Sequence, residues 1–113
     1  MVRTCKRPQC FEKLEEDFVY FEGYDTKPYV YAAISFYPPM AYMHLEVIRF
    51  SHNILKRMIV DWDLLKKVIR ENGVNTVTIT KPGTLDSNKS YIKFLKKLGL
   101  SQPHEILIGT YEI

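Results

Sequence analysis

The chain has 113 residues, of which 46% are hydrophobic and 26% are charged. It is therefore long enough for one globular domain with a single core and too apolar for a disordered chain. No apolar run approaches the ~20 residues of a membrane-spanning helix, and the first eight residues lack the apolar stretch of a secretory signal. The net charge of +3 is weaker than the bias typical of nucleic-acid-binding domains. We expect one domain, over residues 1–113, that stays inside the cell or is packed in a particle.

The N-terminal part leaves room for little regular structure. Residues 17–24 can form a strand, and residues 11–16 can form at most about one and a half turns of helix. Cys5 and Cys10 are too far apart for a redox Cys-x-x-Cys pair, and two thiols alone cannot make a four-ligand zinc site. Further ligands would have to be brought to them by the fold, from His44, His52 and His104. We expect no metal ion and two reduced thiols.

Two strands and a long helix follow. Residues 29–36 and 41–50 are expected to be strands, joined by a turn that contains two prolines, which lack the amide donors of a central strand. Residues 53–72 form the most strongly patterned helix, because apolar residues recur on one face at spacings of three and four. These residues are Ile54, Met58, Trp62, Leu65 and Ile69. Asn72 and Gly73 end the helix.

The last third of the chain predicts a strand, a turn, a helix and a strand. Residues 74–80 are rich in β-branched side chains and are followed by a Lys-Pro-Gly turn. Residues 87–98 carry one apolar helix stripe, made of Tyr91, Phe94, Leu95 and Leu98, and Gly99 closes the helix. Residues 105–113 form the final β-rich run.

This element order, together with the run from Asn88 through Phe94-Leu95 to Gly99, resembles the GCN5-related N-acetyltransferase (GNAT) superfamily. In that superfamily a helix of the type N-x-x-A-x-x-F-Y-x-x-x-G-F lies between the last two parts of the sheet. The resemblance covers about residues 29–113. It implies an α/β (or α+β) fold, in which a mixed, mostly antiparallel sheet of five or six strands is flanked by two main helices.

A narrower similarity links the chain to small acetyltransferase-like proteins of tailed bacteriophages, including a small virion-associated protein of short-tailed phages. They share the altered last helix, which reads Asn, then Phe-Leu, then Gly, and a long basic helix without a glycine loop. In this chain the matching residues are Asn88, Ile92, Phe94, Leu95, Lys96 and Gly99. This similarity implies that the chain is phage-encoded and works in the bacterial host cytoplasm or in a virion.

The pattern also predicts which side chains are buried, with Trp62 packed against the sheet. The expected core is Ile34, Leu45, Val47, Met58, Trp62, Leu65, Ile69, Val77, Ile79, Phe94, Leu98 and Ile108.

The resemblance implies acetyl-CoA as the cofactor of an active member. Backbone amides of a glycine-rich loop at the start of the long helix hold its pyrophosphate. Here the loop falls on residues 53–58, which contain no glycine, and Ile54, Leu55 and Met58 are expected to crowd the phosphates. Lys56 and Arg57 can still attract phosphate as point charges. Contacts to the cofactor, if any, are expected at Ile48, Lys56, Arg57, Met58 and Asn88.

The catalytic groups of the superfamily are only partly present. The tyrosine that protonates the departing thiolate is replaced by Leu95, which cannot donate a proton, so Tyr91, one turn earlier, would have to substitute. His44 and Glu46 alternate onto the same strand face as Tyr42 and are the candidate general bases. For each base the alternative is structural: Glu46 as a solvated sheet residue, and His44 as a partly buried one.

The leading hypothesis is a catalytically degenerate GNAT-fold protein that binds no cofactor and acts by protein contact, in a virion or on a host component. The second is an active acyl-CoA-dependent N-acyltransferase that modifies an amine or a protein lysine. The third is a nucleic-acid-associated accessory protein, favoured only by the basic helices and the tyrosine-rich strands. Exposed strand edges and the tyrosine-rich hairpin also make a homo-oligomer an option.

Overall fold

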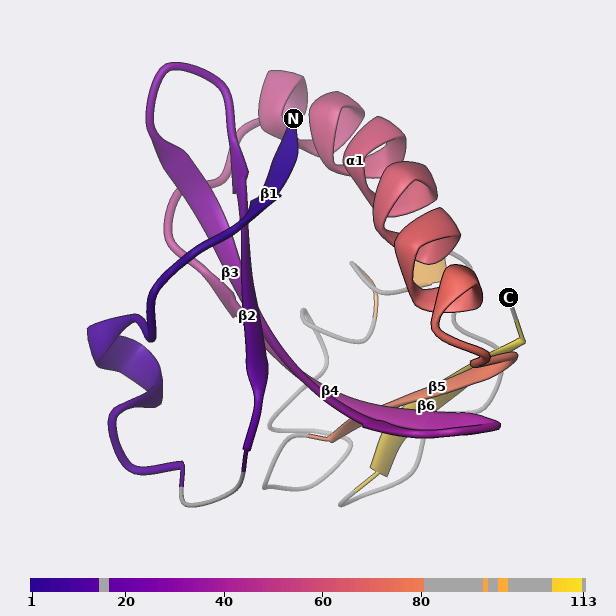
Figure 1. Ribbon diagram of the computed structural model, residues 1–113. Coiled ribbons are helices and arrows are strands. Elements are labelled where there is room, and N and C mark those ends of the chain that lie inside the picture. The colour runs from indigo at the N-terminus through magenta and orange to yellow at the C-terminus, as the bar shows by residue number, and fades with distance from the viewer. Residues whose placement is uncertain (15–16, 81–92, 94–95, 98–106, 113) are drawn as a thin grey trace.

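The structure is a computed structural model that describes residues 1–14, 17–80, 93, 96–97 and 107–112 (Figure 1). Six strands, a short 3-10 helix and one long helix follow one another in these residues. They are β1 (Val2–Thr4), η1 (Gln9–Phe11), β2 (Val19–Tyr24), β3 (Pro28–Tyr37), β4 (Met40–Val47), α1 (His52–Glu71), β5 (Thr76–Thr80) and β6 (Leu107–Glu112). The helix expected at residues 87–98 falls mostly outside the described residues, although Lys93, Lys96 and Lys97 are helical.

The strands form one mixed sheet whose spatial order, β1-β2-β3-β4-β5-β6, is also their order in the chain. All neighbouring strands are antiparallel except β4 and β5, which run parallel. Parallel neighbours need a crossover connection, and α1 supplies it. The expected mixed, mostly antiparallel sheet is therefore confirmed.

β1 is an edge strand that the sequence did not predict. It has only three residues and pairs with β2, with Val2 opposite Gly23 and Thr4 opposite Phe21. So short a run has no visible alternation, and its extended conformation depends on the neighbouring strand.

Residues 11–16 were expected to form at most about one and a half turns of helix, and over the residues described there the structure stays within that bound. The chain makes the 3-10 turn η1, which follows Pro8 and includes the buried Phe11. The ring of Phe11 stacks on that of Tyr20 in β2, with 6.2 Å between ring centroids. This contact ties the N-terminal segment to the sheet, and Figure 1 shows η1 and α1 on opposite sides of it.

α1 begins and ends at local signals. Ser51 is its N-cap, and the hydroxyl oxygen of Ser51 accepts a hydrogen bond from the amide of Ile54 at 3.1 Å. Beyond the C-cap Asn72, Gly73 has a φ of 79°, a left-handed conformation that favours glycine after a helix. No helix among the described residues, α1 included, combines the length and apolar character needed to span a membrane.

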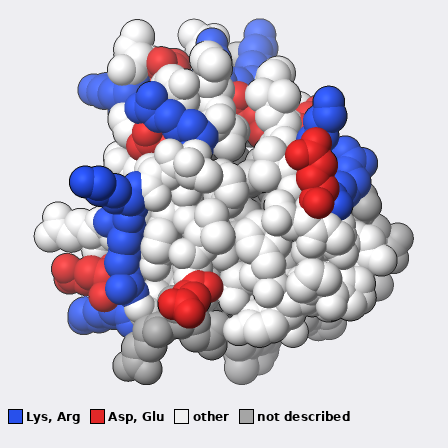
Figure 2. Space-filling model, viewed as in Figure 1, with Lys and Arg blue, Asp and Glu red and all other residues white. Residues whose placement is uncertain are grey.

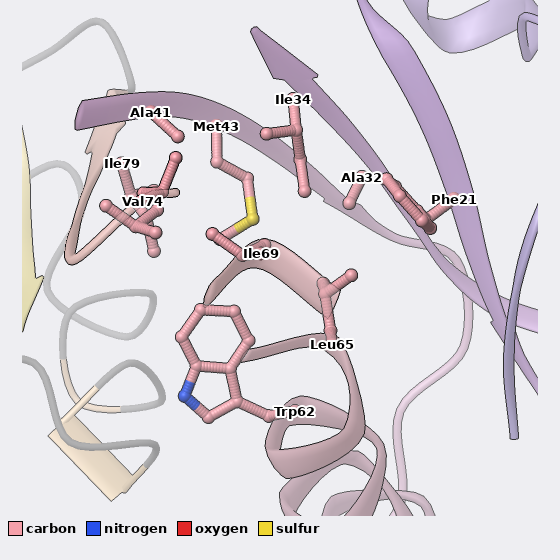
Figure 3. Packing of buried hydrophobic residues seen from close by; sticks show 11 residues of the cluster. Phe21, Ala32, Ile34, Ala41, Met43, Trp62, Leu65, Ile69, Val74 and Ile79 are labelled. Carbon is pink, nitrogen blue, oxygen red and sulfur yellow. The ribbon is translucent and has the colours of Figure 1, made fainter. Parts of the chain in front are cut away.

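The main core lies between α1 and the sheet (Figure 3). Trp62, Leu65 and Ile69 of α1 pack with Ile34 and Met43 of the sheet, and Trp62 is only 8% exposed, as expected. The other expected core residues that are confirmed as buried are Met58, Val77 and Ile79.

Two of the expected core residues pack at the edge of the buried clusters. Leu45 is partly buried against the main core. Val47 is partly buried against a second cluster formed by Tyr29, Ile54 and Met58. Phe94, Leu98 and Ile108, the remaining expected members, lie outside the side chains that the structure describes.

Candidate functional site

The expected site lies where β4 separates from β5 and turns into α1. The parallel pairing of β4 with β5 ends at Met43 and Ile79, whereas β4 continues to Val47. Residues 48–51 then connect β4 to α1, which starts at His52. The end of β4 and the start of α1 are thus adjacent in the chain, which is the arrangement in which the resemblance implies acyl-CoA binding.

His44 and Glu46 share one face of β4, as the alternation predicted, and the structure shows that it is the face opposite α1. They stand opposite Ala33 and Tyr31 of β3, while Leu45 between them turns toward the main core. His44 is half-buried, and its ring meets the edge of Phe18 at a centroid distance of 5.5 Å. Glu46 is exposed. The structure therefore brings both candidate bases to one face, whereas Tyr91, the candidate acid, lies outside the described residues.

The N-terminal segment shares this face. Cys5 and Cys10 are free thiols. Burial raises the pKa of the Cys10 thiol, and the nearby negative charge of Glu46 raises it further. A raised pKa keeps Cys10 protonated and poorly nucleophilic near neutral pH. Among the described residues, no three His, Cys, Asp or Glu side chains gather closely enough to hold a metal ion.

The segment expected to be the phosphate loop, residues 53–58, is helical. α1 begins before it, and Ile54, Leu55 and Met58 are buried, with Ile54 and Met58 packed against Tyr29 of β3. The expectation that they crowd the phosphates of acetyl-CoA stays a prediction. Lys56 and Arg57 are exposed on α1, and Asn88 lies outside the described residues.

The turn into α1 is fastened to the β2–β3 hairpin. The amides of Ile48 and Arg49 both donate to the carbonyl oxygen of Tyr29, at 2.8 and 3.3 Å. The Arg49 guanidinium donates to a carboxylate oxygen of Asp25 at 2.7 Å and to the carbonyl oxygens of Lys27 at 2.8 Å and Pro28 at 3.2 Å. Mainly through the hydrogen bond from Arg49, the pKa of the Asp25 carboxyl lies well below its usual range. Arg49 is thus already neutralised.

The side chains on the rest of this turn are large and apolar. Ile48 is 49% exposed and Phe50 is 59% exposed. The hydroxyl of Ser51 already accepts a hydrogen bond from the amide of Ile54, so an anion at the helix start would compete with Ser51 for that donor.

A buried polar cluster that the sequence analysis missed lies on the other side of the sheet. The hydroxyl of Tyr29 donates to the carboxylate of Asp61, and both residues are buried. The ammonium group of Met1 also contacts Asp61, at 2.9 and 3.0 Å from its two carboxylate oxygens, and donates to the carbonyl of Tyr24 at 2.8 Å. Burial and the hydrogen bond to Asp61 raise the pKa of Tyr29. In the sequence, the signal that could have indicated this cluster is Asp61, whose carboxylate flanks the apolar stripe of the long helix.

This cluster borders an apolar pocket between α1 and the strands β1 to β4. Its empty volume is about 470 Å³, counting the part open to solvent, and Val2, Leu45, Met58 and Leu65 are among the side chains that line it. On the molecular face drawn in Figure 2, acidic and basic side chains are interspersed around a broad uncharged area. That face therefore carries no extended surface of one sign.

Comparison with known proteins bears on the fold. No protein-family profile matches the chain, and no curated protein matches it in sequence. Among solved structures it is similar to a GNAT acetyltransferase, AAC(6')-Ib in complex with paromomycin and acetyl-CoA. The TM-score is 0.56 at 10% sequence identity, and the match covers 82% of this chain but only 62% of that one. This similarity confirms the expected GNAT-like fold.

Proposed function

We propose that this chain is a GNAT-fold protein that transfers no acetyl group and acts by contact with another protein. The observation that carries the proposal is the state of the turn between β4 and α1. Pyrophosphate binding requires a backbone that the anion can approach closely, together with free positive potential. The turn instead bears the exposed side chains of Ile48 and Phe50, and its one cation, Arg49, is held by Asp25.

The surroundings of the candidate bases support the same proposal. The half-buried ring of His44 packs against the ring of Phe18. At the position where the resemblance implies a proton-donating tyrosine, the sequence has Leu95, which cannot act as a general acid. The similarity of the sequence of residues 88–99 to that of small phage proteins supports a protein partner in a virion or in the bacterial host.

An active N-acyltransferase is the second candidate. The structural neighbour is complexed with acetyl-CoA, and His44 and Glu46 share one face of the strand that carries the base in this superfamily. On this alternative, Lys56 and Arg57, exposed in the first turns of α1, would attract the phosphates.

Calorimetry with acetyl-CoA separates the two candidates. We expect no saturable heat up to about 1 mM cofactor, a range that would reveal even weak specific binding. Saturable binding with a micromolar dissociation constant would overturn the proposal. Lys56→Ala/Arg57→Ala should then weaken that binding, whereas Lys67→Ala, a loss of charge farther along α1, should not. Release of thiol from acetyl-CoA in the presence of mixed amine acceptors is the second measurement, and we expect none.

A further inference from the structure

α1 carries a second apolar stripe, separate from the one that builds the core. Val60 is 60% exposed, Leu64 is 48% exposed and Val68 is 38% exposed, so all three present apolar surface to solvent. Residues four apart on a helix are displaced by only about 40° around its axis, so the three side chains form one continuous ridge. This ridge lies about 120° around the helix from the buried stripe of Met58, Leu65 and Ile69.

The ridge has charged ends of opposite sign. Arg57 precedes Val60 by one turn and Glu71 follows Val68 by one turn, which places both on the same strip of α1. Both are exposed, and within the described part of the chain neither has an ion-pair partner. When two copies of this ridge run in opposite directions, the basic end of each lies beside the acidic end of the other.

We propose that two copies of this chain associate through antiparallel contact of their α1 helices, with the two-fold axis at Leu64. In that arrangement residues equally far before and after Leu64 face one another across the axis. Leu64 meets Leu64 of the second copy, and Val60 meets Val68. Arg57, seven residues before the axis, meets Glu71, seven residues after it, and the symmetry makes two such pairs. The interface is then apolar at its centre and charged at its rim.

The expected dimer is weak. α1 has 20 residues, so it is ~30 Å long, and one helix pair buries less than the ~1,200 Å² of a standard stable interface. We therefore expect a dissociation constant in the range of about 10 μM to 1 mM. This contact is independent of acetyl-CoA, so it can fail or hold whatever the calorimetry shows.

Sedimentation velocity on the full chain, from about 10 μM to about 1 mM, tests the contact. The wild-type sedimentation coefficient should rise from the monomer toward the dimer value. R57E places two acidic pairs in the dimer and E71R places two basic pairs, so each should raise the dissociation constant about tenfold or more. An equimolar mixture of the two variants should recover the dimer, because each facing pair is again acidic with basic. R70E, a charge reversal on α1 away from the ridge, is the matched control and should dimerise like the wild type.

A wild type that stays monomeric to the highest concentration overturns the proposal. So does a mixture that stays monomeric while circular dichroism shows both variants folded, because the antiparallel pairing requires complementation. Cross-linking gives an independent measurement in a C5S/C10S background. L64C should form a disulfide-linked dimer readily on mild oxidation, since that position meets itself. V60C should not, since Val60 faces Val68, and equal cross-linking of both would contradict the two-fold at Leu64.

Discussion

Replacing Tyr29 by phenylalanine removes one oxygen atom from a fully buried side chain of β3. That oxygen donates a hydrogen bond to the buried carboxylate of Asp61 on α1. A hydrogen bond to a charged group contributes about 1.5–3 kcal/mol, and the ring that fills the space remains in place. The ammonium group of Met1 still contacts Asp61, so we expect Tyr29→Phe to lower the free energy of unfolding by about 2 kcal/mol.

Urea unfolding followed by tryptophan fluorescence measures this loss, because Trp62 is the single tryptophan and is buried in the core. With a urea dependence of about 1.5 kcal/mol per molar, the midpoint should fall by about 1.3 M. Tyr31→Phe is the matched control. Tyr31 lies two residues away on the same strand and is only partly buried, so the change should stay within about 0.5 kcal/mol.

Two results would refute the reasoning. One is a loss for Tyr29→Phe no larger than that for Tyr31→Phe. The other is an unchanged loss in an Asp61→Asn background, since a direct interaction requires the two substitutions to be non-additive. The pH dependence gives a further check. The pKa of Tyr29 is raised in the folded state. The contribution of its protonated hydroxyl to the free energy of unfolding is therefore present below about pH 10 and is lost as the pH rises above that value. Tyr29→Phe should lack this alkaline loss.

Two further substitutions test the hairpin beside the β4–α1 turn. Because the pKa of Asp25 is lowered in the folded state, the Asp25–Arg49 pair stabilises the protein above about pH 4 and loses its effect as the pH falls below that value. The difference in urea midpoint between wild type and Asp25→Asn should therefore shrink from pH 7 to pH 3, and a constant difference would contradict the assignment. Gly23→Ala would place a methyl group 2.8 Å from Cγ1 of Val30 and 3.0 Å from the ring of Tyr29. We expect this overpacking to lower the free energy of unfolding by about 1–3 kcal/mol, measured by thermal unfolding. An unchanged melting temperature would show that Val30 and Tyr29 move aside at little cost.

The elements with local signals were predicted well from the sequence. The long helix was expected at residues 53–72 and occupies His52–Glu71. It could be predicted because its apolar spacing and its end at Asn72 and Gly73 depend only on residues close together in the sequence. β4 was expected to reach residue 50 but ends at Val47. Beyond Val47 the amides of Ile48 and Arg49 share one acceptor, the carbonyl of Tyr29, so the regular ladder with β3 does not continue, and no local pattern in the sequence reveals this.

In the candidate site, too, the features with a local sequence signal were predicted and those that join distant residues were not. The shared face of His44 and Glu46 follows from the two-residue period of a strand and was predicted. The neutralisation of Arg49 by Asp25 was not, because it joins two residues 24 positions apart. The pairing of Tyr29 with Asp61 spans 32 positions and was missed for the same reason. Ile54, Leu55 and Met58 are buried because of the phase of the helix, and their expected crowding of the phosphates stays a prediction.

The agreement between strand order in the sheet and strand order in the chain has a consequence for synthesis on the ribosome. Each of β2, β3 and β4 pairs with the strand made just before it, so this meander can assemble from local contacts as it emerges. The parallel edge of β4 must wait until all of α1 and then β5 have been made, since the crossover separates them by more than 25 residues. During that interval the unpaired edge of β4 and the bare apolar face are the parts of the nascent chain most exposed to mispairing, and hence the natural place for a chaperone to bind.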